Sequence, residues 1–409
     1  MATSRQHGTG ALVALLALAI FIHALDRGNF ATAAPLIKDA LALSNSQLGV
    51  LLSAFYWTYV PGHLLAGAAI GRLGAARTLA LGLAVWSLAT FLTGFAGGFA
   101  SLFALRLLLG VGESTGFPAV SAMLAAVLPE ERRTRGNALV GAGLMGGNGM
   151  GVLLGGLLLA ALGWHALFWL FGALSLLWLV PWLRVSGRHP LVAPVASTAL
   201  EQGPGYRRLL ANRKTWGAMF GQFCGNYPYF VILSWLPLYL VKQQGFSIRA
   251  MAWTGAAVYL IATLVNLVGG PWVDRQVAKG ADVARLRKAC VIVSGVIALA
   301  CMLACALGGP RVAVGGLLAY SLSAGIGSFA IFAAGQTLAG PAAAGKWMSL
   351  QNGVGGLSGV AGPLLTGVLI DATGNYRVAF LFAAGVLVVG LAMWGPMIGR
   401  IEEIDWDRA

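Results

Sequence analysis

Long apolar stretches recur along the whole chain and are separated by short polar connections. Segments of about 20 apolar residues can cross a bilayer as helices, and the sequence contains twelve of them. We expect them at 11–35, 47–70, 78–97, 101–127, 137–160, 166–184, 215–240, 251–273, 288–307, 312–336, 347–370 and 377–399. The pattern predicts an all-α membrane protein with an N-terminal half at 1–184, a cytoplasmic central loop at 185–214 and a C-terminal half at 215–409.

Composition excludes an ordinary soluble protein. Hydrophobic residues make up 58% of the chain and charged residues only 10%, and the mean hydropathy is +0.80. The first apolar run lacks a small-residue cleavage site, so we interpret it as a retained helix rather than a signal peptide. Gly143, Gly147, Gly151 and Gly155 follow one another at four-residue spacing. This spacing predicts a strip along which two membrane helices pack closely.

The formal charge of +14 is unevenly distributed among the loops. Loops on the side of the two termini hold 20 Lys and Arg residues, and the opposite loops hold five. By the positive-inside rule, both termini should be cytoplasmic. The membrane topology explains the excess of basic over acidic residues, so we expect no nucleic-acid partner.

Four charged residues lie deep in the apolar segments: Asp26, Arg27, Arg106 and Glu113. Such charges are expensive in a membrane and usually face a cavity or a partner. Arg106 and Glu113 lie two turns apart on one helix face, whereas Asp26 and Arg27 point about 100° apart. We therefore expect Asp26 to pair with Arg106 and Arg27 with Glu113. The alternative is that these ion pairs only hold the two helices together.

The charged pairs can couple an anion to a proton. Burial disfavours the charged form of a carboxylate, and a nearby Arg favours it. If Arg27 moves to a substrate anion, its carboxylate partner becomes easier to protonate. The guanidinium suits carboxylates because it donates two parallel hydrogen bonds.

Two short cytoplasmic loops echo each other in the two halves. "GAAIGRLGAAR" (67–77) follows the second segment and "GPWVDRQ" (270–276) follows the eighth. Two parallel six-helix repeats are typical of the major facilitator superfamily, which the chain resembles over its full length. The resemblance implies two pseudo-symmetric halves and gating roles for Arg72, Asp274 and Arg275. Gly71 stands where the superfamily's first loop has Asp.

Longer motifs narrow the resemblance. They are "LDRGNFATAAP" (25–35), "RLLLGVGESTGFPA" (106–119), "LPEERRTRG" (128–136), "WLPLYLVKQQGFS" (235–247) and the stretch 338–380. They are similar to the anion:cation symporter family, whose bacterial members include sugar-acid, hexuronate and galactonate transporters. That resemblance implies proton coupling at Asp26 and Glu113, substrate binding at Arg27, Tyr59 and Asn352, and a salt-bridge role for Arg106.

The chain departs from this family at three positions. Ala24 replaces a frequent Tyr, His63 replaces a Gln, and only Asn148 could supply the family's polar residue in the fifth segment. The seventh segment adds Asn226 and Tyr229, which could bind substrate hydroxyls or tie helices together. His23 precedes Asp26 by three residues and could relay a proton or be a neutral buried side chain.

The sequence contains no P-loop, metal cluster or enzyme site, so we expect no cofactor and no metal. We interpret the chain as a monomeric inner-membrane symporter that imports protons with an organic anion. The anion would be a sugar acid or related hydroxycarboxylate. Three alternatives stay open: a transporter of aromatic, phthalate-like or other monocarboxylates, a drug:proton antiporter, and a transporter-like sensor.

Overall fold

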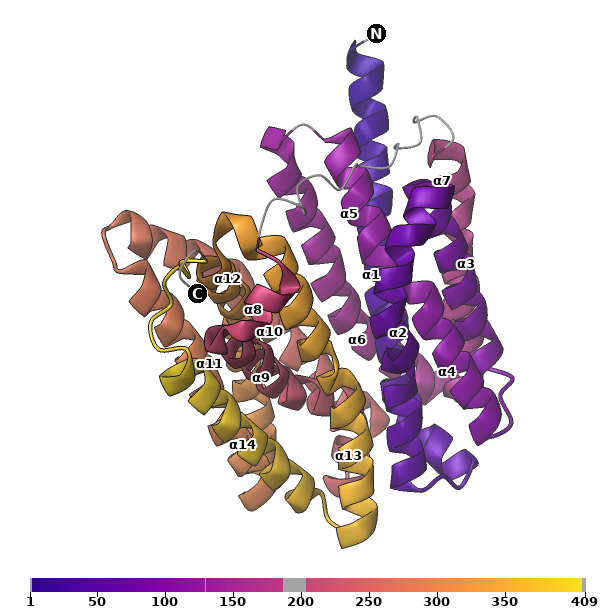
Figure 1. Cartoon of the computed structure of the whole chain (residues 1–409). Helices are drawn as coiled ribbons and strands as arrows, with labels where there is room; N and C mark the ends of the chain where they lie inside the picture. Colours follow the sequence, from indigo (N-terminus) through magenta and orange to yellow (C-terminus); the bar gives the residue numbers. More distant parts are fainter. Residues whose placement is uncertain (1, 129, 187–203, 407–409) are drawn as a thin grey trace. The chain divides into compact units, whose positions relative to one another are not determined.

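The computed structural model describes residues 2–128, 130–186 and 204–406 (Figure 1). Every regular element in these ranges is helical. The first part of the chain contains α1 (Ala2–Ala40), α2 (Asn45–Leu73), α3 (Ala75–Thr93), α4 (Phe99–Glu113), α5 (Gly116–Val127), α6 (Glu130–Leu177) and α7 (Leu179–Ser186). The second part contains α8 (Tyr206–Ala211), α9 (Arg213–Leu238), η2 (Tyr239–Gln243), α10 (Ile248–Ala278), α11 (Val283–Leu307), α12 (Pro310–Gly356), α13 (Ser358–Thr373), α14 (Tyr376–Ala392) and η3 (Met393–Met397).

The expected twelve spans are present, although several helices merge or divide them. Nine stretches of the described residues are long and apolar enough to cross a membrane. One of them, Leu139–Ser186, holds two spans separated at Gly163, whose φ of 78° breaks the helix. Helices α2 and α9 have 29 and 26 residues, enough to span, but carry more polar side chains. The all-α membrane fold predicted from the sequence is confirmed.

The chain forms two compact units. The first comprises 1–195 together with 234–256, and the second comprises 196–233 and 257–409. Segment 234–256 joins the first unit through an ion pair between Lys242 and Asp39 and through α10–α6 packing. The half boundaries expected from the sequence remain a prediction. Of the expected central loop, 187–203 lies outside the described residues, and α8 lies near its end.

The predicted glycine strip packs α6 against α1, as Figure 1 shows for the two neighbouring helices. A Cβ at Gly143 would lie 2.5 Å from the carbonyl oxygen of Ala17, and one at Gly151 would lie 2.9 Å from that of Leu25. A Cβ at Gly147 would overlap the carbonyl oxygen of Phe21. Only glycine permits this approach, so the strip sets the position of α1 and of the charged residues on it.

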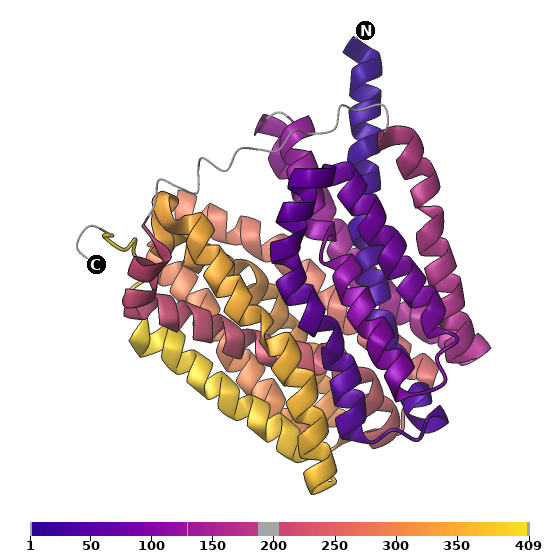
Figure 2. The same ribbon diagram turned by 45° about the vertical axis from the view of Figure 1, so that its right-hand side comes forward.

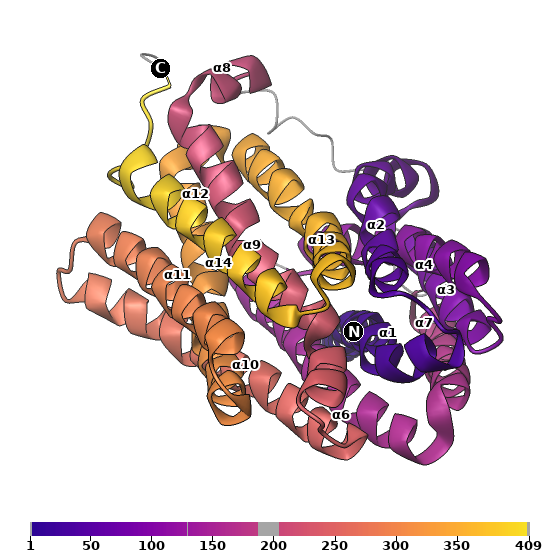
Figure 3. The same ribbon diagram turned by 90° about the horizontal axis from the view of Figure 1, so that it is seen from below.

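Helices α2, α3 and α4 also pack together in the first unit and cluster in Figure 3. A Cβ at Gly112 of α4 would lie 2.7 Å from the backbone nitrogen of Trp86 on α3. A Cβ at Gly110 would overlap the carbonyl oxygen of Phe55 on α2. Close packing on both sides fixes α4, which carries Arg106 and Glu113.

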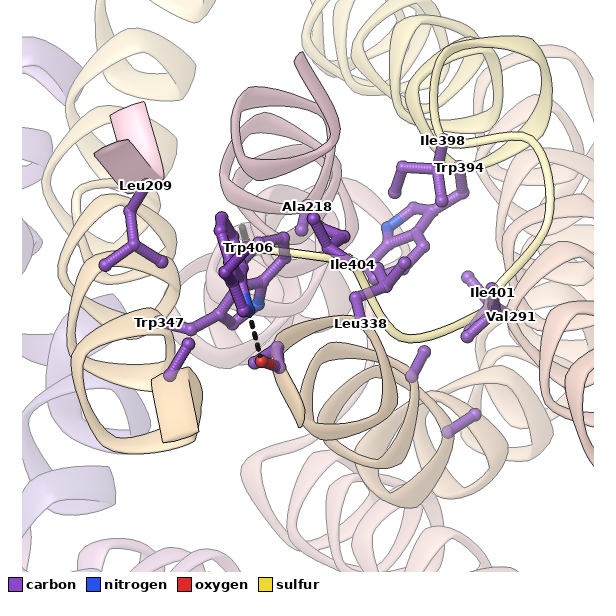
Figure 4. Packing of buried hydrophobic residues seen from close by; sticks show 14 residues of the cluster. Leu209, Ala218, Val291, Leu338, Trp347, Trp394, Ile398, Ile401, Ile404 and Trp406 are labelled. Atoms are coloured by element: carbon purple, nitrogen blue, oxygen red, sulfur yellow. Dashed lines mark hydrogen bonds between the residues drawn. The ribbon is translucent and has the colours of Figure 1, made fainter. Parts of the chain in front are cut away.

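The second unit packs α11 against α12 and α14, and in Figure 2 the yellow α14 lies next to the orange α13. A tryptophan-rich cluster joins its helices to the end of the described chain (Figure 4). Trp406 donates its indole N–H to the carbonyl oxygen of Ala339 at 2.7 Å, and the backbone N–H of Ile404 donates to Leu338 at 3.0 Å. The two acceptors, Leu338 and Ala339, directly precede Gly340, where a φ of 65° breaks α12.

Candidate functional site

All four charges predicted to lie inside the membrane belong to the first unit. Asp26 and Arg27 lie on α1, and Arg106 and Glu113 lie on α4. The side chains of Asp26, Arg106 and Glu113 are buried, while the Arg27 side chain is 16% exposed. Arg27 is therefore the member of the group that an incoming ligand can reach.

The expected pairing of Arg27 with Glu113 is confirmed. Both Nε and Nη2 of Arg27 lie 3.4 Å from Oε2 of Glu113 and donate to it. These are long contacts for charge-assisted hydrogen bonds, which are usually below 3 Å. The guanidinium thus has a carboxylate partner but is not tightly clamped by it.

The expected ion pair between Asp26 and Arg106 is wrong. Oδ2 of Asp26 accepts a hydrogen bond from the Ser175 hydroxyl of α6 at 2.9 Å. Arg106 donates instead to the carbonyl oxygens of Leu51 and Leu52 on α2, at 3.1 and 3.4 Å. Within the described chain Arg106 therefore ties α4 to α2 and has no carboxylate partner. The physical reason is the angle between neighbouring side chains: with Arg27 facing Glu113, Asp26 faces α6.

Asp26 and Glu113 each keep one oxygen without a protein partner in the described residues. These atoms are Oδ1 of Asp26 and Oε1 of Glu113, and both are buried. Buried polar atoms are normally paired, and exceptions often mark functional positions. Each free oxygen is a position where a proton can be held.

His23 completes the cluster around Arg27. Its Nε2 lies 2.7 Å from Nη2 of Arg27, and its Nδ1 lies 3.1 Å from Oε2 of Glu113. The side chain is fully buried. Sequence reasoning related His23 to Asp26, but the four-residue spacing to Arg27 was the informative signal, because such residues share a helix face.

Two aromatic rings on α2 cover the guanidinium of Arg27. Its Cζ lies 4.6 Å from the ring centre of Tyr59 and 5.0 Å from that of Phe55. The two rings stack with their centres 4.8 Å apart. Tyr59 was expected near the site from the resemblance, whereas Phe55 was missed, although the pair is spaced four residues apart on one helix.

In the second unit, amide side chains from α9 and α12 form a connected network. Gln222 donates to Oδ1 of Asn352 at 2.9 Å and accepts from Gln351 at 2.7 Å. Trp347 donates to Oε1 of Gln351 at 2.7 Å. Asn352 is exposed, and the other three side chains are buried. The network presents one accessible amide, at a position that the resemblance indicated.

Asn226 lies one turn beyond Gln222 and faces the same region of α12. Its amide nitrogen donates to the carbonyl oxygen of Gly355 at 3.3 Å. Tyr229 follows three residues later on α9 and is half-buried. Hence two of the expected polar residues, Asn226 and Asn352, are brought to neighbouring turns of the same helix pair.

The structure describes the three positions that depart from the expected motifs. Ala24 is fully buried, and a Cβ at Gly147 would lie 2.8 Å from the Ala24 side chain, so the α1–α6 strip leaves little room for Tyr at position 24. Nδ1 of His63 lies 2.8 Å from the carbonyl oxygen of Tyr59 and, since that oxygen only accepts, donates to it. Asn148 is half-buried on α6.

Comparison with known proteins identifies the family. The sequence profile of the Major Facilitator Superfamily matches residues 16–359. The chain belongs to this superfamily. A second profile, described as vacuole effluxer Atg22 like, matches the shorter range 342–398.

Named relatives and a solved structure agree with the superfamily. A probable sulfoacetate transporter from Cupriavidus necator is 29% identical, and the alignment covers 96% of this chain and 94% of the relative. A hexuronate transporter from Bacillus subtilis is 27% identical over 95% of both chains. The crystal structure of a bacterial homologue of the human lysosomal transporter Spinster superposes with a TM-score of 0.79 at 18% identity, covering 95% of this chain and 96% of that one. This structural likeness shows the fold alone.

Membership and the apolar helices establish a multi-pass membrane protein of a transporter superfamily, not an enzyme. The residues expected to gate such a transporter lie at helix ends. Arg72 and Arg275 are exposed and belong to the last turns of α2 and α10. Asp274 lies in α10, but its side chain lies outside what the structure describes. Their gating roles remain predictions.

Proposed function

We propose that the protein is a proton-coupled symporter that imports an organic anion, a sugar acid or related hydroxycarboxylate, by alternating access. The observation that carries the proposal is Arg27. It is the partly exposed member of the buried charge group, and its carboxylate contacts are long. A guanidinium held in this way can exchange Glu113 for a substrate carboxylate.

Anion binding would proceed by this exchange. Arg27 offers a planar fork with several donors and stays protonated, so it can hold both oxygens of a carboxylate. The faces of Tyr59 and Phe55 against the guanidinium add cation–π attraction and restrict its movement. Tyr59 also offers a hydroxyl that could contact the substrate.

Proton coupling would follow from the loss of the ion pair. When Arg27 binds the substrate, the buried Glu113 carboxylate loses the cation that hydrogen-bonds to it, which is unfavourable. A proton taken up by the cluster relieves that cost. Asp26 would be a second proton site, because its buried Oδ1 has no hydrogen-bond partner among the described residues, while its Oδ2 accepts from the Ser175 hydroxyl.

Substrate hydroxyls would bind to neutral polar groups of the second unit. The side-chain carbonyl oxygen of Asn352 accepts a hydrogen bond from Gln222, so Asn352 would donate its amide N–H groups to a ligand. Asn226 and Tyr229 lie on the facing helix α9. The amide network positions Asn352 and supplies the donors that a hydroxylated acid requires.

The names of relatives support an anionic substrate but not one particular acid. One relative is named as a hexuronate transporter and another as a probable sulfoacetate transporter. Both substrate names describe anions that a guanidinium can bind. Localisation in the inner membrane with cytoplasmic termini, and gating by Arg72, Asp274 and Arg275, complete the proposal.

A second candidate function is transport of an aromatic monocarboxylate. It is favoured by the stacked rings of Phe55 and Tyr59 beside Arg27, which could contact an aromatic acid. A drug:proton antiporter fits less well, because two buried arginines would repel a cationic drug.

Uptake into proteoliposomes tests the proposal. The vesicles would be inside-alkaline or without a gradient, and the labelled compounds would be D-glucuronate, sulfoacetate, phthalate and glucose. Accumulation of one acid only with the gradient is expected. Equal uptake with and without the gradient would remove proton coupling, and preferential uptake of phthalate would support the second candidate. Uptake of glucose alone would contradict anion transport.

A further inference from the structure

The contacts of His23 determine which of its two nitrogens carries a proton. Arginine can only donate hydrogen bonds. Nε2 of His23, 2.7 Å from Nη2 of Arg27, must therefore accept, and it carries no proton. The proton of the neutral ring lies on Nδ1, which is 3.1 Å from Oε2 of Glu113 but makes no hydrogen bond to it in this geometry. Arg27 thus blocks the nitrogen at which His23 would be protonated.

We propose that His23 takes up one coupling proton when Arg27 leaves for the anion, and that its imidazolium replaces Arg27 as the counter-charge of Glu113. The inference rests on the proposed function and deepens it. When Arg27 moves away, Nε2 of His23 loses its hydrogen-bond donor and Glu113 loses its positively charged partner. Protonation of Nε2 restores a positive charge beside Glu113.

The charge balance of this step is simple. Before binding, Arg27 and Glu113 cancel and His23 is neutral. After binding, Arg27 cancels a monovalent anion, and the imidazolium of His23 cancels Glu113. One proton therefore enters with one negative charge, and it leaves from Nε2 when Arg27 returns. The pair of events moves no net charge for a monocarboxylate.

The groups around His23 determine which partner an imidazolium at this position would have. The titratable or charged groups that face it are Arg27 on its own helix, Tyr59 and His63 on α2, and Glu113 on α4. On α3 and α5 it meets the rings of Trp86 and Phe117, with ring centres 5.9 and 5.5 Å away. Glu113 is the anionic member of this group, so an imidazolium here has one partner and a defined orientation.

Nitrogen NMR of histidine-labelled protein in bilayers tests the proposal directly. Without an anion, wild-type His23 should be neutral with its proton on Nδ1. In Arg27→Gln, also without an anion, both ring nitrogens should shift to imidazolium positions at the same pH. Adding Glu113→Gln to that variant should return the neutral ring. His23→Gln assigns the signal, and His63→Gln removes the half-buried histidine beside Tyr59 from the spectrum.

Two results would overturn the inference: a proton on Nε2 in the wild type, or a neutral His23 in Arg27→Gln. The first needs no variant, so it holds even if Arg27→Gln fails to fold. Neither result depends on transport, so they are separate from a failure of the proposed function. D-glucuronate or sulfoacetate, whichever accumulates, should produce the imidazolium signal in the wild type.

Transport by His23→Gln gives a second reading. Glutamine can accept from Arg27 and donate to Glu113, but it does not titrate. We expect gradient-driven accumulation to fall roughly tenfold, the amount that one unit of pH gradient supplies per proton. Exchange at equal pH should fall less than gradient-driven accumulation, whereas a merely structural role would lower both equally. Unchanged accumulation with an unchanged pH profile would contradict the proposal.

Discussion

In the first unit the buried polar residues near the candidate site are ionic, whereas in the second unit they are amides. Arg27, His23 and Glu113 form a charged cluster in which each member contacts the other two. Gln222, Gln351 and Asn352 form a chain of neutral hydrogen bonds. The two sets of side chains therefore differ in their chemistry: the cluster in the first unit can exchange charge, whereas the amides in the second donate and accept hydrogen bonds without changing charge.

The difference also concerns how well each set is satisfied. In the first unit, Asp26 and Glu113 keep carboxylate oxygens without a protein partner among the described residues. In the second, the buried amide atoms of Gln222 and Gln351 are paired with each other or with Asn352 and Trp347. A satisfied network is rigid and specific, while an unsatisfied ionic one can take up a ligand or a proton. We therefore expect proton coupling to depend on residues of the first unit and substrate selection to depend on residues of the second.

The largest effect should come from Arg27→Lys, which keeps the charge of the first unit and removes its fork. Losing one charge-assisted hydrogen bond to a carboxylate costs about 2 kcal/mol, so the apparent affinity should fall roughly 30-fold. Concentration-dependent uptake measures this change. Arg311→Lys, at an exposed arginine, is the control and should leave the affinity unchanged. Unaltered affinity in Arg27→Lys would remove this residue from the anion site.

A second test asks whether the first unit alone carries the coupling. Asp26→Asn should lower accumulation driven by an inside-alkaline gradient, because the amide cannot take up a proton, while exchange of anion across the membrane persists. One unit of pH gradient can concentrate an anion roughly tenfold per proton, and this factor should be lost. Glu402→Gln, at an exposed carboxylate, is the control. Accumulation that survives in Asp26→Asn would make the Asp26–Ser175 contact merely structural.

The sequence predicted the charge-bearing helices and the strip that packs them, but not all of the contacts. Four glycines at four-residue spacing lie on one face of α6, and this pattern predicts that a neighbouring helix packs against that face. The twelve spans follow from apolar length. In both cases the information is local, because a helix repeats its faces with a fixed period.

Contacts between distant segments were harder to predict from the sequence, because they depend on how each helix is rotated about its axis. Ser175 reaches Asp26 from 149 residues away, and nothing in either local pattern relates them. Arg106 binds backbone carbonyls of α2, a partner that every helix segment could offer. The four-residue spacing predicts that His23 lies on the same helix face as Arg27. The contact of both residues with Glu113 could not be predicted until the position of Glu113 was known.

A smaller effect is expected from the neutral network. Asn352→Ala removes an exposed amide of the second unit and should lower the affinity for a hydroxylated acid roughly fivefold to tenfold, the value of one hydrogen bond of about 1–1.5 kcal/mol. Its dependence on the pH gradient should not change. Gln243→Ala is the control at another exposed amide. If Asn352→Ala altered the gradient dependence, coupling would not be confined to the first unit.

The smallest effect on transport, but a measurable one on stability, should come from Gly147→Ala in the strip that supports the ionic cluster. The added methyl group would overlap the carbonyl oxygen of Phe21 and crowd Ala24, so α1 and α6 would have to separate. Overpacking of this kind costs about 1–3 kcal/mol. Gly141→Ala on the same helix is the matched control, because a Cβ there meets no atom within 4 Å. Thermal unfolding in detergent should show a lower midpoint for Gly147→Ala only. Equal midpoints would mean that α1 is positioned by its charged contacts rather than by the glycine strip, and that the ionic cluster of the first unit holds its own helix in place.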